Sequence, residues 1–268
     1  MKCLKEAVYG FAVGDALGVP FEFQKRGTYQ CLGMIGGGTW SEPEGTWSDD
    51  TSMLLATMDS IREKRCIDPE DMMRRFHRWA EDAEYSCNGH VFDIGMTTRA
   101  AIARYGGGVP SFLCGAEDDR SNGNGSLMRI LPLAFTAATD DEINAVSALT
   151  HAHELSKLCC RQYVAVARYI IERHRIPHEW AERMQVTPLE KVRSTGYVVD
   201  TLAAVMWCLV NTESYADAVL TAVNLGGDTD TIAALTGGLA GILYGIGDIP
   251  EEWIGKLRNC AEIERCLF

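Results

Sequence analysis

The sequence predicts one all-α domain over residues 1–268, with its functional groups on the loops between helices. Two observations support this fold class. Apolar residues recur at helical spacing through most of the chain, and no segment shows the sustained apolar-polar alternation with β-branched residues that is typical of strands. Clusters of glycine and proline separate the helical segments, and no repeat of fixed period is visible.

The helical pattern begins near the N-terminus and is interrupted by a long loop over residues 20–47, which is rich in glycine and proline. Loops of that length are uncommon unless they are functional. Asp68 and Pro69 predict a helix start, as cap and first helical residue. Residues 84–93 read as irregular. The predicted helices are 4–19, 50–64, one from 68 onward, 97–105, 127–136, 141–149, 154–174, 197–211, 215–223 and 229–244.

Two predicted helices carry glycine at every fourth position. The first has Gly10, Gly14 and Gly18, and the last has Gly237, Gly241 and Gly245. Glycine in a helix costs about 1 kcal/mol relative to alanine, so close helix packing is the natural compensation. We therefore predict that both helices lie at the centre of the bundle with neighbours against these stripes.

Composition excludes several classes of protein. A hydrophobic fraction of 47% is ordinary for a folded chain, and a net charge of -12 argues against nucleic acid as a partner. The ten cysteines lack C-x-x-C spacing, so we expect reduced thiols in the cytoplasm. Acidic residues interrupt the N-terminal apolar stretch, and residues 232–247 are too short to span a bilayer, so neither a signal peptide nor a membrane segment is expected.

Two helix starts each carry a pair of aspartates and a hydroxyl. Asp49 and Asp50 follow Ser48, and Asp228 and Asp230 precede Thr231. If the two starts converge, four carboxylates would repel one another unless cations were present, and hard oxygen ligands suit Mg²⁺, Mn²⁺ or Ca²⁺. The alternative is two capped helices that never meet. Patterning alone leaves both possibilities open.

Other candidate residues lie on loops. Glu22 stands between two phenylalanines, where an apolar setting would favour acid-base chemistry, although a solvated loop glutamate is the simpler interpretation. The glycine-rich turn over residues 121–126 offers backbone N–H groups at a helix start, which suits a phosphate or merely a turn. His151 and His153 face different ways on a helix, so a joint metal site is doubtful. Asp15 lies inside an apolar helix, where we expect it to hydrogen-bond a loop.

Six motifs, in order and over nearly the whole chain, resemble those of the ADP-ribosylglycohydrolases, the family of the dinitrogenase reductase-activating glycohydrolase and the ADP-ribosylarginine hydrolases. They are Gly14-Asp15-Ala16-Leu17-Gly18 with Glu22, Gly45-Thr46-Trp47-Ser48-Asp49-Asp50-Thr51, Asp93-Ile94-Gly95 with Thr97-Thr98-Arg99, Gly123-Asn124-Gly125-Ser126-Leu127-Met128-Arg129, Thr150-His151 and Gly226-Gly227-Asp228-Thr229-Asp230-Thr231.

The resemblance implies a single-domain orthogonal helical bundle with two Mg²⁺ or Mn²⁺ ions and Glu22 as the catalytic glutamate. The metal ligands that it implies are Ser48, Asp49, Asp50, Asp228, Asp230 and Thr231; many members have threonine in place of Ser48. The implied substrate-binding residues are Asp93, Ser121, Asn122, Gly123, Asn124, Gly125 and His151, against the ribose and diphosphate of ADP-ribose.

The expected activity is hydrolysis of the bond between C1 of the distal ribose and a protein side chain, with arginine chosen on the family alone. Serine, O-acetyl and nucleic-acid linkages would present the same ADP-ribose to these motifs. The expected partner is therefore an ADP-ribosylated protein or a small ADP-ribose conjugate, bound by a monomer. The competing interpretations are a non-catalytic ADP-ribose reader, which the presence of all the acids disfavours, and a di-metal phosphatase acting on nucleotides.

Overall fold

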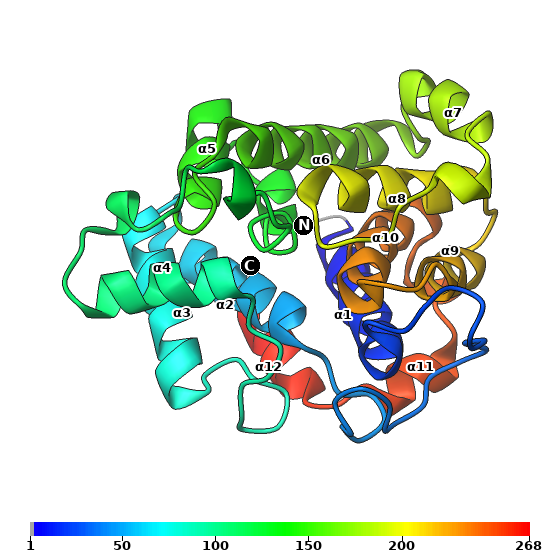
Figure 1. Cartoon of the computed structure of the whole chain (residues 1–268), viewed down its shortest axis with the longest axis horizontal. Helices are drawn as coiled ribbons and strands as arrows, with labels where there is room; N and C mark the ends of the chain where they lie inside the picture. The colour runs from blue at the N-terminus through cyan, green and yellow to red at the C-terminus, as the bar shows by residue number, and fades with distance from the viewer. Residues whose placement is uncertain (1–2) are drawn as a thin grey trace. The chain divides into compact units, whose positions relative to one another are not determined.

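The computed structural model describes residues 3–268 and confirms the all-α fold class. Within that range it has no β-sheet, and its β-type pairings include the isolated bridges of Gly37 with Glu42 and of Ala116 with His151. Short 3-10 turns join the helices (Figure 1). The α-helices are α1 Leu4–Gly18, α2 Asp49–Lys64, α3 Pro69–Asp82, α4 Met96–Gly106, α5 Asp140–Ala148, α6 Glu154–Arg173, α7 His178–Gln185, α8 Val198–Val210, α9 Tyr215–Asn224, α10 Thr229–Tyr244, α11 Glu251–Lys256 and α12 Cys260–Cys266.

The contacts divide the chain into two compact units. Unit 1 consists of the chain up to Trp47 together with Val166–Arg258, and unit 2 consists of Ser48–Ala165 with Asn259–Phe268. Unit 1 holds α1 and α7 to α11, and unit 2 holds α2 to α5 and α12. Helix α6 begins in unit 2 and ends in unit 1. A single domain over residues 1–268 stays a prediction.

Unit 1 is built on the contact between α1 and α10, which lie side by side (Figure 1). A Cβ on Gly10 would lie 2.3 Å from the carbonyl oxygen of Gly237, and one on Gly14 would lie 2.1 Å from that of Ala233. Real Cβ atoms never approach so closely, so glycine allows the two backbones to touch. The predicted central packing is confirmed for both helices.

One member of the glycine stripes is placed differently from the prediction. Gly245 caps the C-terminus of α10 at φ 83°, and its position faces open space. Glycine is favoured there because L-residues rarely adopt positive φ. Its role is therefore to end the helix.

Helix starts agree with the sequence where a capping residue marks them. The Asp68 side chain accepts the N–H of Asp71 at 3.0 Å, and Pro69 opens α3 as predicted. The predicted helix over 127–136 is wrong: those residues form turns and a 3-10 helix, Leu131–Phe135. Pro132 lacks an N–H and disfavours α-helical backbone before it, although the apolar run resembles a buried helix. Three short helices that the sequence did not indicate are α7, α11 and α12.

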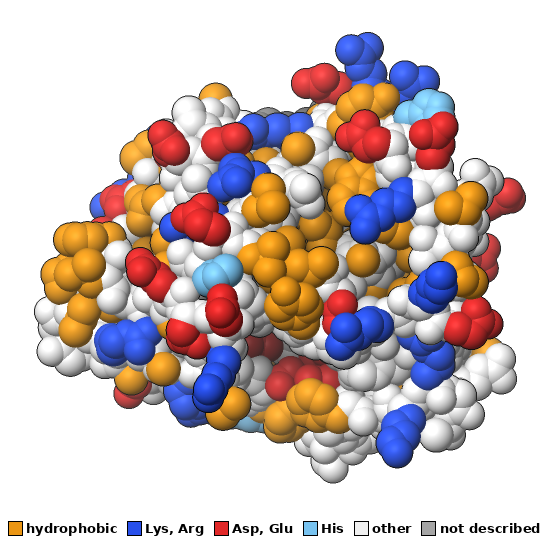
Figure 2. Space-filling model, turned by 45° about the horizontal axis from the view of Figure 1, so that its top comes forward, with side chains coloured by type: hydrophobic (Ala, Val, Ile, Leu, Met, Phe, Trp, Pro, Cys, Tyr) orange, Lys and Arg blue, Asp and Glu red, His pale blue; other side chains and the backbone are white. Residues whose placement is uncertain are grey.

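Three further properties concern the apolar character of the helices, the charge on the surface and the state of the cysteines. Of the helices described, none combines the length and apolar character needed to cross a bilayer. On the face in Figure 2, acidic and basic side chains are interspersed and do not gather into a basic patch. The described cysteines are all free thiols.

Candidate metal and substrate sites

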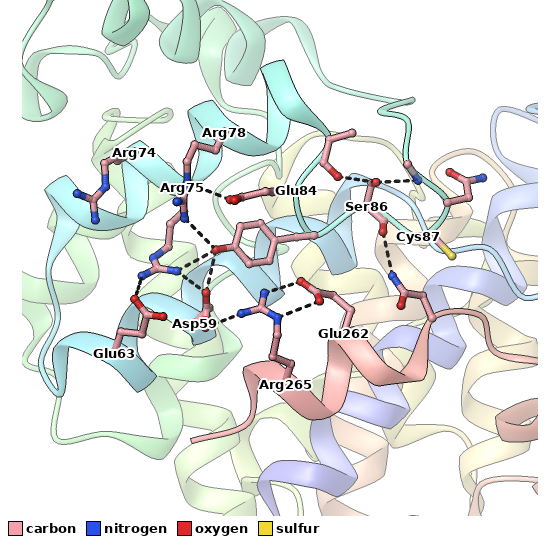
Figure 3. Close-up of a pocket in the computed structure, with 15 residues that line it drawn as sticks. Asp59, Glu63, Arg74, Arg75, Arg78, Glu84, Ser86, Cys87, Glu262 and Arg265 are labelled. Atoms are coloured by element: carbon pink, nitrogen blue, oxygen red, sulfur yellow. Dashed lines mark hydrogen bonds and ion pairs between the residues drawn. The ribbon is translucent and has the colours of Figure 1, made fainter.

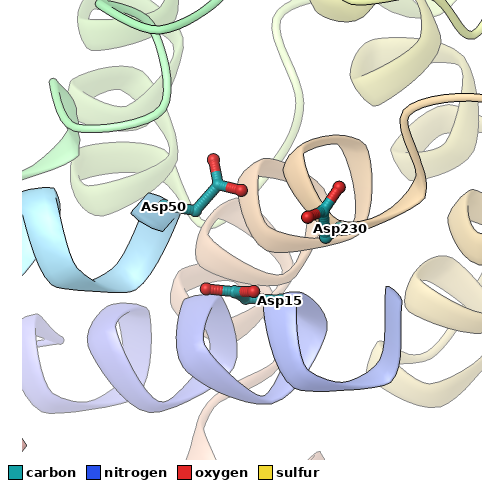
Figure 4. Close-up of side chains that lie close together, drawn as sticks. All are labelled: Asp15, Asp50 and Asp230. Atoms are coloured by element: carbon teal, nitrogen blue, oxygen red, sulfur yellow. The ribbon is translucent and has the colours of Figure 1, made fainter. Parts of the chain in front are cut away.

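Unit 1 brings together a cluster of carboxylates at the meeting point of α1 and α10. Oxygens of Glu22, Asp228 and Asp230 all lie within 4.8 Å of one another, and Asp15 has an oxygen within the same distance of Asp230. Figure 4 shows the Asp15 carboxylate on α1 and the Asp230 carboxylate on the first turn of α10. Glu22 and Asp230 are buried. Such a group of oxygens has the chemistry of a hard divalent cation site.

The end of α1 and the start of α10 are held in register by close backbone contacts. The Thr229 hydroxyl donates to the carbonyl oxygen of Gly18 at 2.8 Å, and a Cβ on Gly18 would lie 2.3 Å from the Asp230 Cα. The chain leaves α1 through the 3-10 turn Val19–Phe21, so Glu22 arrives beside the α10 acids. A glycine at position 18 is therefore a condition for this cluster.

The loop that carries Asp228 pairs with the loop that carries Glu22. The Phe23 N–H donates to the Gly227 carbonyl oxygen at 2.7 Å, and the Gly227 N–H donates to that of Gln24 at 2.8 Å. Gly227 has φ 76°, and a Cβ there would lie 2.1 Å from the carbonyl oxygen of Ser194. These contacts fix the backbone immediately before Asp228.

Asp228 does not serve as a helix cap. It occupies the N-cap position of α10 at φ -87° and ψ 76°, but its side chain makes no capping hydrogen bond. Asp230 accepts the N–H of Thr231 at 3.0 Å within the first turn, and Thr231 itself is buried. The alternative of an ordinary capping aspartate is thus wrong for Asp228.

Glu22 is held by residues of the long loop over 20–47. It is 4% exposed, so the expectation of a solvated loop glutamate is wrong. The Trp40 indole N–H donates to Glu22 Oε2 at 2.5 Å, and the Thr39 hydroxyl donates to the Glu22 carbonyl oxygen at 2.6 Å. Gly38, at φ 68°, approaches the Pro20 backbone so closely that a Cβ would lie 1.9 Å from its carbonyl oxygen. The loop thereby fixes the Glu22 carboxylate.

In unit 2 the second acid pair opens α2. The cap is Ser48, whose hydroxyl accepts the Asp50 N–H at 3.3 Å and lies 3.1 Å from Asp50 Oδ2. Asp49 and Asp50 follow in the first turn, and both are buried. Figure 4 shows the Asp50 side chain leaving this turn. Because Ser48 caps the helix, neither aspartate is needed as the cap.

The predicted substrate loop of unit 2 surrounds His151. A Cβ on Gly125 would lie 2.9 Å from His151 Cε1, so glycine lets the loop approach the ring. Asn122 accepts the Ser156 hydroxyl at 2.9 Å, and Ser121 donates to Asp118 at 2.7 Å. The helix start expected here is wrong, because the α-helix predicted after the loop is absent. Gly123 and Asn124 lie in the same turn, which the Met128 N–H closes onto the Asn124 carbonyl oxygen.

His151 is buried and hydrogen-bonds Thr150 Oγ1 through Nδ1 at 2.8 Å. Burial, followed by the charge of Arg129, lowers the His151 pKa to about 3, so the ring is neutral at pH 7. Arg129 itself is fully buried: its guanidinium donates to the carbonyl oxygens of Gly125 and Val146 and to Thr150 Oγ1. Burial lowers the Arg129 pKa only to about 10, so it remains a cation.

Two further candidates are Asp93 and His153. Asp93 is half-buried on the segment before α4 and has φ 55°, in the left-handed region. His153 hydrogen-bonds Asp119 at 3.1 Å through Nε2. His151, in contrast, is buried. The two histidines therefore have different surroundings, but neither is on a helix as predicted, because both lie in the segment between α5 and α6.

Unit 2 also has a charged hollow of about 790 Å³ among α2, α3 and α12 (Figure 3). Arg75 bonds Glu63 at 2.7 Å, and Arg265 bonds Glu262 at 2.5 Å and Asp59 at 3.2 Å. Arg78 bonds Glu84 at 2.9 Å. Because its arginines already pair with carboxylates, the hollow lacks the unbalanced positive charge of a phosphate site.

Asp59 is the shared acceptor of that network. Burial alone would raise the pKa of the Asp59 carboxyl, but hydrogen bonds from Arg62 and Tyr85 and the charges of Arg75 and Arg265 hold it below its usual value. The network joins α2, α3 and α12, and we interpret it as structural.

Sequence reasoning missed three residues of these sites. Asp15 was expected to bond a loop, yet its carboxylate lies beside Asp230. Trp40 lies in a loop without periodicity, and Arg129 lies in an apolar run that resembles a helix core. The Asp15 signal was available, since a carboxylate among three glycines on an otherwise apolar face needs a polar partner or a cation.

Comparison with known proteins identifies a family and several relatives that this chain resembles. A family model described as ADP-ribosylglycohydrolase matches residues 4–267. The ADP-ribosylarginine hydrolase Tri1 of Serratia proteamaculans is 34% identical over 94% of this chain and 74% of its own length. The ADP-ribosyl-[dinitrogen reductase] glycohydrolase of Rhodospirillum rubrum is 33% identical, over 96% and 91%. A solved structure titled ADP-ribosylglycohydrolase-related protein complex aligns with TM-score 0.78 and 31% identity, over 98% of this chain and 93% of that one.

Proposed function

This chain belongs to the ADP-ribosylglycohydrolase family, and we propose that it is a metal-dependent hydrolase that releases ADP-ribose from ADP-ribosylated arginine on protein. Its membership of this family makes it a glycohydrolase, and the arginine linkage is the more specific part of the proposal. That choice is supported by relatives named for arginine and dinitrogen reductase.

The observation that carries the proposal is the carboxylate cluster of Glu22, Asp228 and Asp230. Its oxygens fit a hard cation such as Mg²⁺ or Mn²⁺, and three carboxylates so close together would repel one another without one. The proposed ligands of two such ions, taken from the family motifs, are Ser48, Asp49, Asp50, Asp228, Asp230 and Thr231. When bound, the ions would supply Lewis-acid stabilisation of the ribose oxygens and acidify a water.

Glu22 is the proposed proton carrier. In the overall reaction a water oxygen forms a bond to ribose C1, and the bond from C1 to the guanidine nitrogen breaks with its electron pair on nitrogen. The Glu22 carboxylate accepts a proton from the water and returns it to that nitrogen, so free ADP-ribose and arginine result. Its fixed position between Trp40 and the α10 loop supports this role.

We propose that the loop over 121–126 and His151 contact the ribose and diphosphate of ADP-ribose, with Asp93 near the distal ribose. Arg129 supports this part of the proposal, because its buried cation lies directly under the Gly125 carbonyl. A positive charge beneath the loop favours an anionic ligand on a chain whose net charge is -12. A neutral His151 can donate or accept a hydrogen bond there without titrating.

The proposed setting is a cytoplasmic monomer that acts on an ADP-ribosylated protein or a small ADP-ribose conjugate. Its support is the ten cysteines, which are free thiols in the described chain and suit a reducing compartment.

The test is incubation with arginine-, serine- and O-acetyl-linked ADP-ribose, with and without Mg²⁺, measuring free ADP-ribose. Faster release from the arginine conjugate than from the other two, dependent on Mg²⁺, is the expected result. Release from another linkage in preference to arginine would change the substrate, and binding without release would make the chain a reader. Phosphate release would indicate a phosphatase.

A further inference from the structure

An aromatic pair stands beside the Glu22 carboxylate in unit 1. Phe23 and Trp40 meet edge to face, with ring centroids 6.3 Å apart and an interplanar angle of 61°. Trp40 is half-buried and bonds Glu22 Oε2 through its indole N–H. Trp40 is therefore linked to Glu22, the proposed proton carrier, by a hydrogen bond, and Phe23 is linked to it by a peptide bond.

Phe23 is exposed to solvent and has an unfavourable backbone conformation. Its side chain is 66% exposed, and its φ of 62° lies in the left-handed region that bulky residues rarely adopt. Its N–H is held by the Gly227 carbonyl oxygen, which fixes this conformation. A large apolar ring that is kept in an unfavourable backbone state and turned to solvent does not contribute to a core, and such strain is typical of ligand-contacting residues.

We infer that Phe23 and Trp40 are the specificity-determining residues that receive the leaving group, and that the group they fit is the guanidinium of an arginine side chain. The inference rests on the proposed function. The bond to be broken joins C1 to the leaving group, and Glu22 delivers the proton to that group, so side chains around the Glu22 carboxylate are its neighbours. A guanidinium is planar and cationic, and it stacks on aromatic faces.

The same site offers little to the other linkages. A serine leaving group has neither a positive charge nor a π system to place on an aromatic face, and an acetate leaving group has no positive charge. The Glu22 carboxylate adds a charge-charge attraction for a cation, which a neutral hydroxyl lacks. The aromatic pair thus favours arginine over serine through the leaving group, while the ADP-ribose half of the substrate is bound identically.

The test compares Phe23→Leu and Trp40→Phe with wild type on ADP-ribosyl-arginine and ADP-ribosyl-serine peptides. Phe23→Leu keeps apolar bulk but loses the ring face, so kcat/KM for the arginine peptide should fall roughly 3- to 30-fold. Turnover of the serine peptide and inhibition by free ADP-ribose should not change. Trp40→Phe keeps a ring but loses the bond to Glu22, so kcat should fall for both peptides. Phe112→Leu, at another phenylalanine that is 74% exposed, is the matched control.

A second measurement does not depend on turnover. N-acetylarginine amide is titrated into ¹⁵N-labelled protein, and the Trp40 indole signal, assigned by its loss in Trp40→Phe, is followed with N-acetylserine amide as the comparison. The arginine amide should shift the signal in wild type and less in Phe23→Leu, and the serine amide should not. An equal loss on both peptides in Phe23→Leu, or no selective shift, overturns the inference. An inactive wild type that still shows the shift would refute only the hydrolysis.

Discussion

At the scale of single residues, Glu22 carries the proposed proton transfer, and its neighbours hold it in place. Glu22→Gln keeps the shape and an oxygen for the Trp40 N–H but cannot exchange the proton. Turnover should therefore fall by about 10²- to 10⁴-fold, the usual contribution of general acid-base catalysis. ADP-ribose affinity, measured by calorimetry, should stay within about twofold. Retained turnover would remove Glu22 from the mechanism.

His151 makes a prediction about stability and pH. Its folded-state pKa of about 3 lies below the ordinary value of 6.5, so the unfolded chain binds a proton that the folded chain does not. Stability should therefore fall as pH falls from about 6.5 towards 3, by about 2 kcal/mol between pH 7 and pH 5. His151→Gln should remove about that part of the pH dependence in urea unfolding curves.

The exposed residue His178 is the control for this measurement, because His178→Gln changes a histidine whose side chain is 81% exposed. It should leave the wild-type pH dependence in place. Equal slopes for wild type and His151→Gln would mean that the buried ring takes up its proton without cost.

At the scale of elements, the contact of α1 with α10 should tolerate no added carbon. Gly14→Ala would place a Cβ 2.1 Å from the Ala233 carbonyl oxygen, so the helices must separate. The expected loss is about 1–3 kcal/mol or more of unfolding free energy, as for other overpacked cores. Thermal and urea unfolding measure it.

Gly255 in α11 provides the opposite case. It is helical and faces open space, so Gly255→Ala should stabilise the protein by about 0.5–1 kcal/mol. If Gly14→Ala were as harmless as Gly255→Ala, the two backbones could not be in contact.

Arg26 ties its own loop and the segment over residues 189–192 to the loop that presents Asp228. Its guanidinium donates to the carbonyl oxygens of Leu225 at 2.8 Å, Leu189 at 3.0 Å and Val192 at 2.8 Å. Lysine cannot reproduce this fork. Arg26→Lys should therefore increase hydrogen exchange of the Gly227 N–H by about tenfold or more, since each hydrogen bond to a charged group contributes about 1.5–3 kcal/mol. Arg193→Lys, at an arginine with a 72% exposed side chain, is the control. Unchanged exchange of the Gly227 N–H in Arg26→Lys would show that the loop is stable without the Arg26 hydrogen bonds.

The elements that the sequence predicted well have a local signal. Asp68 with Pro69 marked α3, and apolar periodicity marked the long helices α6 and α10. The 127–136 segment was misread because burial, and not helical backbone, accounts for its apolar residues. Helices α7 and α11 each follow a proline and are too short for a periodic pattern, so packing decides them.

The candidate site could be proposed from the sequence where motif residues carry the proposed chemistry themselves. The acids, Glu22 and the loop over 121–126 could be named from the sequence. Trp40 could not, because its role depends on a hydrogen bond across 18 residues of loop. Arg129 was quoted within a motif, but its burial under Gly125 is a tertiary fact.

At the scale of the whole molecule, metal binding should appear as added stability. Mg²⁺ that binds only the folded chain should raise unfolding free energy by about 2.7 kcal/mol at a hundredfold excess over Kd. Asp230→Asn removes one proposed ligand and one negative charge, so the gain should largely vanish while the metal-free protein keeps its stability. Scanning calorimetry with Mg²⁺ and with chelator measures this, and an equal gain in Asp230→Asn would exclude Asp230 as a ligand.

The division of the chain has a consequence for its synthesis. Each unit is assembled from segments far apart in sequence, and unit 2 ends with Asn259–Phe268. The Asp59 carboxylate on α2 therefore emerges some two hundred residues before its partner Arg265. A ribosome presents residues in order, so unit 2 cannot reach all of its native contacts until residues 259–268 have emerged, and its apolar helices stay exposed for longer than those of a unit built from one continuous segment.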